Sequence, residues 1–209
     1  MHFLRVIMSV RGTIPTRGNN VKRTIGIAIL LLTSTACFAA PVTYDIDPNH
    51  TYPSFEADHA GLSTFRGKFR ATSGVVRLDR EARSGDLEVT VDTTSLDFCH
   101  DKLNTHAKSA DMFNVEKFPT AVYLGRFSKF ENDAPTEVDG QLTLHGVTKP
   151  VKLTIVKFVC RLDTRRNKEV CGANATGSIN RADFGIDFGQ KMGFGQDVAL
   201  VIQVEAIAK

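Results

Sequence analysis

From residue 42 onward the sequence consists largely of short runs in which apolar and polar residues alternate. In residues 85–92, for example, Leu87, Val89 and Val91 alternate with polar or charged residues. An alternation of period two places the apolar side chains on one face of a β-strand. About nine such runs follow one another, and Gly, Asn, Asp and Pro residues separate them. The pattern therefore predicts an all-β chain.

The order of these runs restricts how the strands can pair. They do not alternate with helical segments, which argues against a parallel α/β sheet. A long antiparallel sheet tends to close on itself, because closure removes the unpaired edge strands. We therefore expect an antiparallel β-barrel, with a β-sandwich as the alternative form of closure.

One stretch, residues 105–119, interrupts the strands and has a helical pattern at its start. Leu103, Ala107 and Ala110 fall at i, i+4 and i+7, which places them on one face of a helix. Met112, Phe113 and Phe118 follow, and Pro119 ends the segment. The pattern predicts one short helix with an apolar underside, suited to covering one end of a barrel.

Residues 1–39 have the features of a cleaved signal peptide. No acidic residue precedes Asp45, an apolar run spans residues 25–32, and small residues favour cleavage after Ala39. The apolar run is too short for a membrane span, which needs roughly 20 residues. We therefore expect that the protein is exported to the periplasm and that residues 40–209 form a single domain. The alternative is a lipoprotein acylated on Cys37.

Removal of this leader changes the charge of the chain. It contains five cationic residues, which leaves 21 Lys and Arg against 23 Asp and Glu in the rest. The sequence pI of about 8.7 therefore reflects the leader, and the remainder lacks the basic character expected of a nucleic-acid-binding protein.

Three cysteines follow the leader, in what should be an oxidising compartment. Cys160 ends one strand-like run and Cys171 begins the next, so we expect a disulfide between them. Cys99 is then left over. It is either a buried, inert thiol or an exposed one that can pair between chains and give a homodimer.

The residue types favour binding over catalysis. Twelve of the 14 Phe lie after residue 39, together with three Tyr and no Trp. Phe suits the lining of an apolar cavity, although a solid Phe core is the alternative. The histidines lack the spacing of a metal site, and we find neither a Gly-x-Ser-x-Gly motif nor a P-loop. We therefore expect no metal site and no enzymatic activity.

Two loops have a distinctive composition. Phe184, Phe188 and Phe194 each precede a glycine, as a lid over a cavity would require, although an ordinary long turn also fits. Four cations crowd the loop between the paired cysteines: Arg161, Arg165, Arg166 and Lys168. A solvated hairpin tip is the default interpretation of this loop, and a contact with phosphate-bearing head groups is the alternative.

Several segments in register resemble the YceI-like family of exported bacterial proteins. They are residues 46–50 (IDPNH), 59–69 (HAGLSTFRGKF), 106–115 (HAKSADMFNV) with Phe118 and Pro119, 142–151 (LTLHGVTKPV) and 177–185 (GSINRADFG). The likeness covers nearly all of the chain after the leader. Two features depart from it: the cysteine pair belongs to part of the family, and Cys99 stands where similar sequences commonly have Gly.

The resemblance implies an extended, lipocalin-like antiparallel barrel of about eight strands, with a short helix near one end. It also implies that the barrel holds a long-chain isoprenoid or fatty lipid, or a quinone-type lipid, with no other cofactor. We expect the cavity to be lined by Phe55, Phe65, Phe69, Met112, Phe113 and Phe118, with His59, His106 and Lys108 as polar contacts at its mouth.

Two other functions stay open at this point. One is a redox or stress-response role through the thiol of Cys99. The other is an enzyme acting on a lipid or quinone, against which the missing catalytic motif argues.

Overall fold

The computed structural model describes residues 40–209, which form eleven strands, one α-helix and three short 3-10 helices. The expected signal peptide, including Cys37, lies outside the described residues. The strands are β1 (Val42–Ile46), β2 (Tyr52–His59), β3 (Ser63–Phe69), β4 (Thr72–Asp79), β5 (Ser84–Asp92), β6 (Leu96–Asp97), β7 (Thr120–Glu131), β8 (Ala134–Leu144), β9 (Val147–Asp163), β10 (Lys168–Asn180) and β11 (Asp197–Ala208). No helix among residues 40–209 is long and apolar enough to cross a bilayer.

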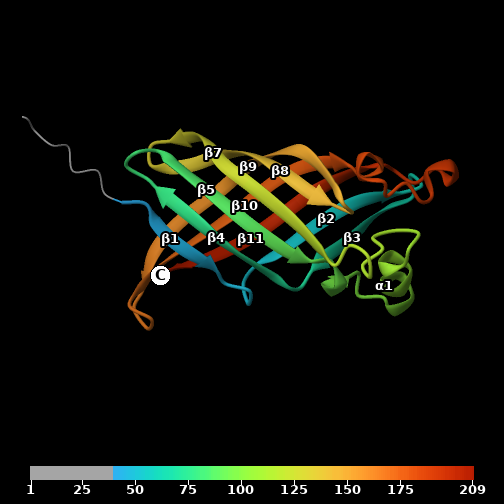
Figure 1. Cartoon of the computed structure of the whole chain (residues 1–209), viewed down its shortest axis with the longest axis horizontal. Helices are drawn as coiled ribbons and strands as arrows, with labels where there is room; N and C mark the ends of the chain where they lie inside the picture. Colours follow the sequence, from blue (N-terminus) through green and yellow to red (C-terminus); the bar gives the residue numbers. More distant parts are fainter. Residues whose placement is uncertain (1–39) are drawn as a thin grey trace, which may run out of the picture. The chain divides into compact units, whose positions relative to one another are not determined.

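Eight of the strands form a closed antiparallel ring in the order β1-β4-β5-β7-β8-β9-β10-β11, which the pairing of β1 with β11 completes. The expected barrel is therefore confirmed, and the sandwich alternative is wrong. Long hairpins build most of the wall, as in the pairing of β10 and β11 from Val170↔Ile207 to Asn180↔Asp197. Figure 1 shows the strands running obliquely along the barrel.

Three strands extend this ring at one end. β11 pairs with β1 near its C-terminus and with β2 near its N-terminus, so β1 and β2 follow one another along the same neighbour. β3 then pairs with β2, and β6 pairs with β3. The extension carries the wall past the closed ring toward α1, which lies at the same end of the barrel (Figure 1).

The helix is shorter than expected and begins earlier. α1 spans Asp101–Lys108, where His100 caps the first turn by accepting the N–H of Leu103 through Nδ1 at 3.2 Å. Leu103 and Ala107 lie on it, but the expected third position, Ala110, lies beyond its end. Ser109 is in an extended conformation, and its carbonyl accepts the N–H groups of Met112 and Asn114. The rest of the predicted segment therefore folds as turns.

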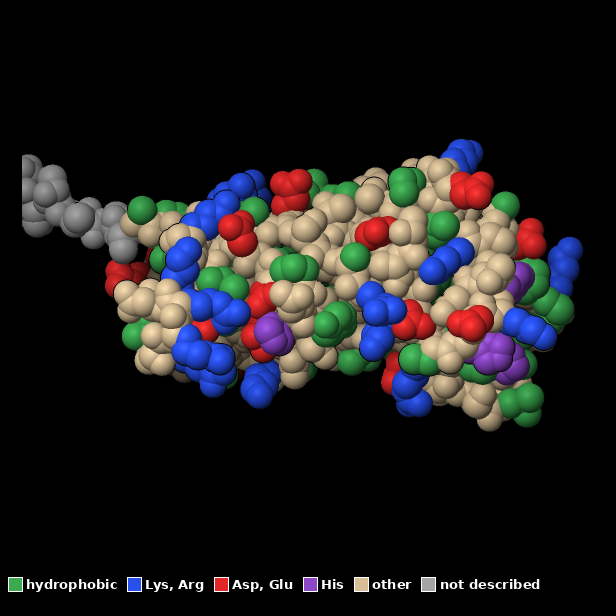
Figure 2. Space-filling view, turned by 90° about the horizontal axis from the view of Figure 1, so that it is seen from below, with side chains coloured by type: hydrophobic (Ala, Val, Ile, Leu, Met, Phe, Trp, Pro, Cys, Tyr) green, Lys and Arg blue, Asp and Glu red, His purple; other side chains and the backbone are tan. Residues whose placement is uncertain are grey.

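The outer surface carries charges of both signs, and Lys and Arg side chains gather near the end opposite α1 (Figure 2). The hairpin between β9 and β10 belongs to this opposite end. There Arg166 forms an ion pair with Asp163 at 2.6 Å, and the Cys160–Cys171 disulfide joins the two strands directly across the ladder. The predicted disulfide is therefore confirmed in the structure. Cys99 is free and exposed, so of the two alternatives the buried, inert thiol is wrong.

We expect this disulfide to stabilise the barrel. Its sequence separation is 11 residues, and the chain-entropy model gives about 3 kcal/mol for closing a loop of this length. The Cys160→Ser, Cys171→Ser double variant should therefore lose about that much free energy of unfolding in a urea titration. Cys99→Ser is the control and should unfold at the wild-type midpoint, because the exposed thiol has no partner. A double variant as stable as wild type would contradict the prediction.

Candidate functional site

The barrel encloses a cavity of about 510 Å³, which is within the range of pockets that bind small molecules. Every strand of the closed ring contributes side chains to its lining. On β11, alternate residues from Val198 to Ala206 line it, and this distance corresponds to about 26 Å along the strand. The cavity is therefore elongated and follows the barrel.

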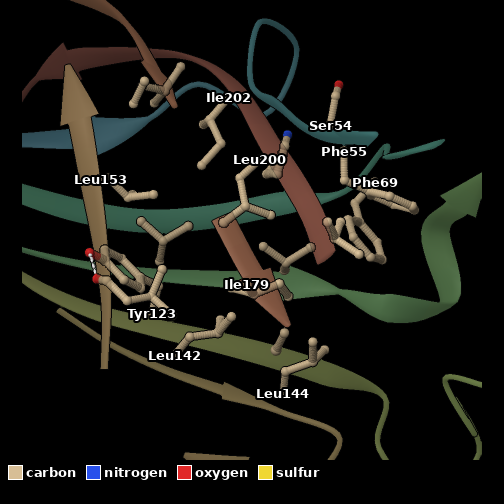
Figure 3. A pocket seen from close by; sticks show the side chains of 18 of the residues that line it. Ser54, Phe55, Phe69, Tyr123, Leu142, Leu144, Leu153, Ile179, Leu200 and Ile202 are labelled. Atoms are coloured by element: carbon tan, nitrogen blue, oxygen red, sulfur yellow. Dashed lines mark hydrogen bonds between the residues drawn. The ribbon is translucent and has the colours of Figure 1, made fainter. Parts of the chain in front are cut away.

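Small and aliphatic side chains line the middle of the cavity. Figure 3 shows Leu142 of β8, Leu153 of β9, and Leu200 and Ile202 of β11 pointing into the same space. On β10, Ala175 lines this stretch, and its methyl group is too short to reach across the barrel. The middle of the barrel thus stays open, and the solid Phe core considered from the sequence is wrong.

The phenylalanines instead gather toward the two ends. At the end near α1, Phe55, Phe69 and Phe113 pack together with ring centroids 5.8 to 6.4 Å apart. At the opposite end, Phe127 and Phe158 pack around Tyr44. We call the end near α1 the mouth and the end at Tyr44 the closed end. Aliphatic side chains thus line the middle of the cavity, and aromatic rings line both ends.

Seven of the nine residues expected at the binding site line the cavity: Phe55, His59, Phe65, Phe69, His106, Met112 and Phe113. Lys108, on α1, is not among the lining residues. Phe118 is not either, because it packs on Gly146 and on the ring of His145, with centroids 4.4 Å apart. The expected place of Phe118 in the cavity is therefore wrong. Contact of the other residues with a ligand stays a prediction.

Sequence reasoning missed the lining that β7 to β11 contribute, which is mostly aliphatic. These residues include Tyr123, Val138, Leu153, Ile155, Leu200 and Ile202. Their inward positions follow the same period-two alternation that predicted the strands. That signal identifies which face is buried, but it does not show whether the opposite walls of a barrel meet.

Three chain segments converge at the mouth: the hairpin tip between β2 and β3, the helix α1, and residues 185–196, which we call the mouth loop. His59 stacks on Phe65 at 4.1 Å and meets Phe194 of the mouth loop edge-on at 4.8 Å. His106 of α1 meets Phe188 of the same loop at 4.6 Å. Both histidines thus join the mouth loop to its neighbours through aromatic contacts.

The mouth loop depends on glycine at its turns. Gly185, Gly189 and Gly193 have φ angles of 75°, 79° and 84°, a region that is strained for other residues. Phe188 and Phe194 line the cavity, whereas Phe184 is buried beneath the start of the loop. The loop therefore covers part of the mouth, as its repeated Phe-Gly pattern suggested.

Arg181, which precedes the mouth loop, is buried and holds the loop by its backbone. Its Nε, Nη1 and Nη2 groups donate to the carbonyls of Gly195, Ile186 and Phe188 at 2.8 to 3.0 Å. Burial lowers the pKa of this guanidinium from its ordinary value. Sequence reasoning missed Arg181, because nothing in the local pattern shows that a charged side chain turns inward.

The closed end contains a half-buried polar cluster whose members are bonded to one another. The Tyr44 hydroxyl donates to Glu169 Oε1 at 2.5 Å, and Arg80 Nη2 donates to Glu169 Oε2 at 3.0 Å. Burial and the hydrogen bond to Glu169 raise the pKa of Tyr44 to about 12. Tyr44 thus remains neutral near pH 7 and leaves no open charge facing the cavity.

One group in the described part of the chain has the spacing of metal ligands: Cys160, Glu169 and Cys171. Both sulfurs belong to the disulfide, so neither is available as a thiolate ligand. These atoms therefore make no metal site while the disulfide is formed.

Comparison with known proteins gives a consistent set of relatives. Residues 44–206 match the family model of the YceI-like domain. The chain is 35% identical over 191 residues to a UPF0312 protein of Enterobacter sp. (strain 638), which covers 89% of this chain and 97% of that protein. It is also 35% identical over 184 residues to protein YceI of Salmonella arizonae, covering 87% and 94%.

Solved structures share the fold. BcnA of Burkholderia cenocepacia superposes with a TM-score of 0.62 at 18% identity, covering 77% of this chain and 98% of that one. The YceI protein of Campylobacter jejuni gives 0.58 at 25% identity, with 73% and 90% covered. A polyisoprenoid binding domain from Saccharophagus degradans gives 0.58 at 14% identity, with 80% and 99% covered.

The raised pKa of Tyr44 predicts a loss of stability at alkaline pH. The folded chain keeps the phenol proton up to about pH 12, whereas the unfolded chain releases it near pH 10. The stabilising contribution is therefore complete below pH 10 and is lost as the pH rises to about 12, by up to about 2 to 3 kcal/mol. The difference in free energy of unfolding between wild type and Tyr44→Phe, measured in urea at several pH values, should fall by that amount. Parallel pH profiles would contradict the assignment.

Arg181 should hold the mouth loop in place. Each hydrogen bond from a charged group contributes roughly 1.5 to 3 kcal/mol, and Arg181→Met removes three of them. We expect the backbone amides of the mouth loop to exchange faster in hydrogen–deuterium exchange mass spectrometry, while those of β9 and β10 keep their protection. Arg66→Met is the control, because Arg66 forms an exposed ion pair with Glu56. Unchanged exchange in the mouth loop of the Arg181→Met variant would show that other contacts hold it.

Proposed function

The chain belongs to the YceI-like family, and we propose that it is a periplasmic carrier of a long-chain isoprenoid or a similar amphiphilic lipid. The observation that carries the proposal is the elongated apolar cavity within the barrel. Each CH₂ group that moves from water into such a lining contributes roughly 0.8 kcal/mol. A long hydrocarbon tail therefore needs few polar contacts for tight binding.

The polar groups of the lining indicate how such a lipid is oriented. Asp58, His59, His106 and Arg181 contribute to the lining at the mouth. In the middle of the barrel the Tyr123 hydroxyl donates to the carbonyl of Val151 at 2.9 Å, and at the closed end Tyr44 is bonded to Glu169. The lipid tail thus enters toward the closed end, and the head group stays at the mouth beside the two histidines.

Two further observations support the proposal. One fold neighbour is described as a polyisoprenoid binding domain, which is a property of that protein and reaches this chain through the shared barrel. The likeness to an exported family and the signal-peptide pattern of residues 1–39 support a periplasmic location. The proposal assigns the barrel no catalytic step.

A side chain that narrows the middle of the cavity should weaken lipid binding. Ala175 on β10 is buried and lines the cavity, so Ala175→Phe places a ring in the path of the tail. We expect at least about a tenfold loss of affinity for a fluorescent polyprenol analogue, because several methylene contacts are lost. Fluorescence titration of the purified protein measures this directly.

Val156→Phe is the matched control. Val156 lies on the neighbouring strand β9, and 63% of it is exposed on the outside of the barrel. The Val156→Phe variant should bind the probe as wild type does. The melting temperatures of the Val156→Phe and Ala175→Phe variants should show that the barrel is intact. Equal affinity of the Ala175→Phe variant and wild type would refute binding in the cavity.

A further inference from the structure

The mouth carries exposed apolar side chains on two of its converging segments. Leu62, at the tip of the β2–β3 hairpin, is 83% exposed, and Met192 of the mouth loop is 59% exposed. Phe188 of the same loop is 38% exposed and also lines the cavity. We call these three residues the apolar rim. Exposed apolar side chains grouped at one site usually mark a contact surface.

The two segments that carry the rim are held together. Gly195 donates its N–H to the carbonyl of Asp58 at 3.4 Å, and Phe194 packs edge-on against His59. The turn at the hairpin tip is tight, because Leu62 donates its N–H to the carbonyl of His59 and Gly61 donates to Asp58 Oδ2. The hairpin tip and the mouth loop lie at the same end of the barrel in Figure 1. The rim is therefore a single structural feature.

The charges around the rim are balanced. Residues 56–66, 101–111 and 185–196 contain four Lys and Arg against five Asp and Glu. In Figure 2 histidine and hydrophobic side chains lie near the α1 end, while the larger group of Lys and Arg side chains lies near the opposite end. The rim therefore has no net positive charge that would attract an acidic partner. Its apolar side chains determine what it can contact.

We propose that the apolar rim docks the mouth of the barrel onto a lipid bilayer. This inference rests on the proposed function, because a lipid that is insoluble in water exchanges most readily where the cavity meets a membrane. Phe188 belongs to both the rim and the lining, so the apolar surface continues from outside the mouth into the cavity. Aliphatic and aromatic side chains that enter the interface of a bilayer are stabilised there by burial of apolar area. The docked mouth then opens toward the acyl chains.

Vesicle sedimentation tests the docking. The protein, purified as the cell processes it, is mixed with sucrose-loaded vesicles of phosphatidylcholine, with and without phosphatidylglycerol. The Leu62→Ser, Met192→Ser double variant should bind vesicles at least about tenfold more weakly than wild type, because two exposed apolar side chains are lost from the interface. Since the local charges balance, the wild-type partition should depend little on salt or on the anionic lipid.

The matched control is the Val156→Ser, Val201→Ser double variant. It removes two apolar side chains that are 63% and 46% exposed on strands β9 and β11. This variant should bind vesicles as wild type does. The proposal is overturned if wild type does not sediment with vesicles, or if the two double variants lose binding equally. It is also overturned if binding depends on Arg161 and Arg165 at the opposite end, or if the rim substitutions instead abolish a dimer seen by light scattering.

A second measurement separates this inference from the proposed function. Neither Leu62 nor Met192 lines the cavity, so the rim variant should bind the polyprenol probe in the absence of vesicles as wild type does. The rim variant should also transfer the probe to vesicles about tenfold more slowly than wild type, in line with its weaker vesicle binding. If the probe does not bind to any variant, the carrier proposal fails, while vesicle sedimentation still decides whether the rim docks.

Discussion

The hollow interior of this barrel depends on the size of its inward-facing side chains. Closure by β1 and β11 fixes eight strands around one axis, and the alternation along each strand directs apolar side chains inward. Protein interiors normally pack to the density of organic crystals. Here the alanines of β10, Ala173 and Ala175, cannot reach the opposite wall, so that an apolar space persists along the barrel. An apolar chain is what such a space accommodates at the lowest cost in desolvation.

The two ends of the barrel differ in a way that gives the cavity a direction. At the closed end, Tyr44, Glu169 and Arg80 satisfy one another beside the disulfide. At the mouth, the segment from Arg181 to Gly195 is held through backbone carbonyls and through aromatic contacts with two histidines. The two lining histidines and the exposed apolar side chains thus occur together at the mouth.

The sequence was sufficient to predict the strands, the barrel and the disulfide, because these follow from period-two alternation and from the position of Cys160 and Cys171. It was not sufficient for the helix limits, since the extended Ser109 ends α1 before Ala110. For a related reason, Phe118 was wrongly expected to line the cavity, and Arg181 was not predicted at all. Whether one side chain points into or away from a cavity depends on contacts such as that between Phe118 and His145, which are distant in sequence.

The central claim is that the cavity holds a long apolar chain. Native mass spectrometry of the protein as purified, followed by organic extraction of whatever is bound, tests it most directly. The account predicts one long-chain isoprenoid or similar amphiphilic lipid per barrel, released on unfolding. A protein of ligand-free mass that also takes up no lipid from a panel of polyprenols, quinones and fatty acids would contradict it.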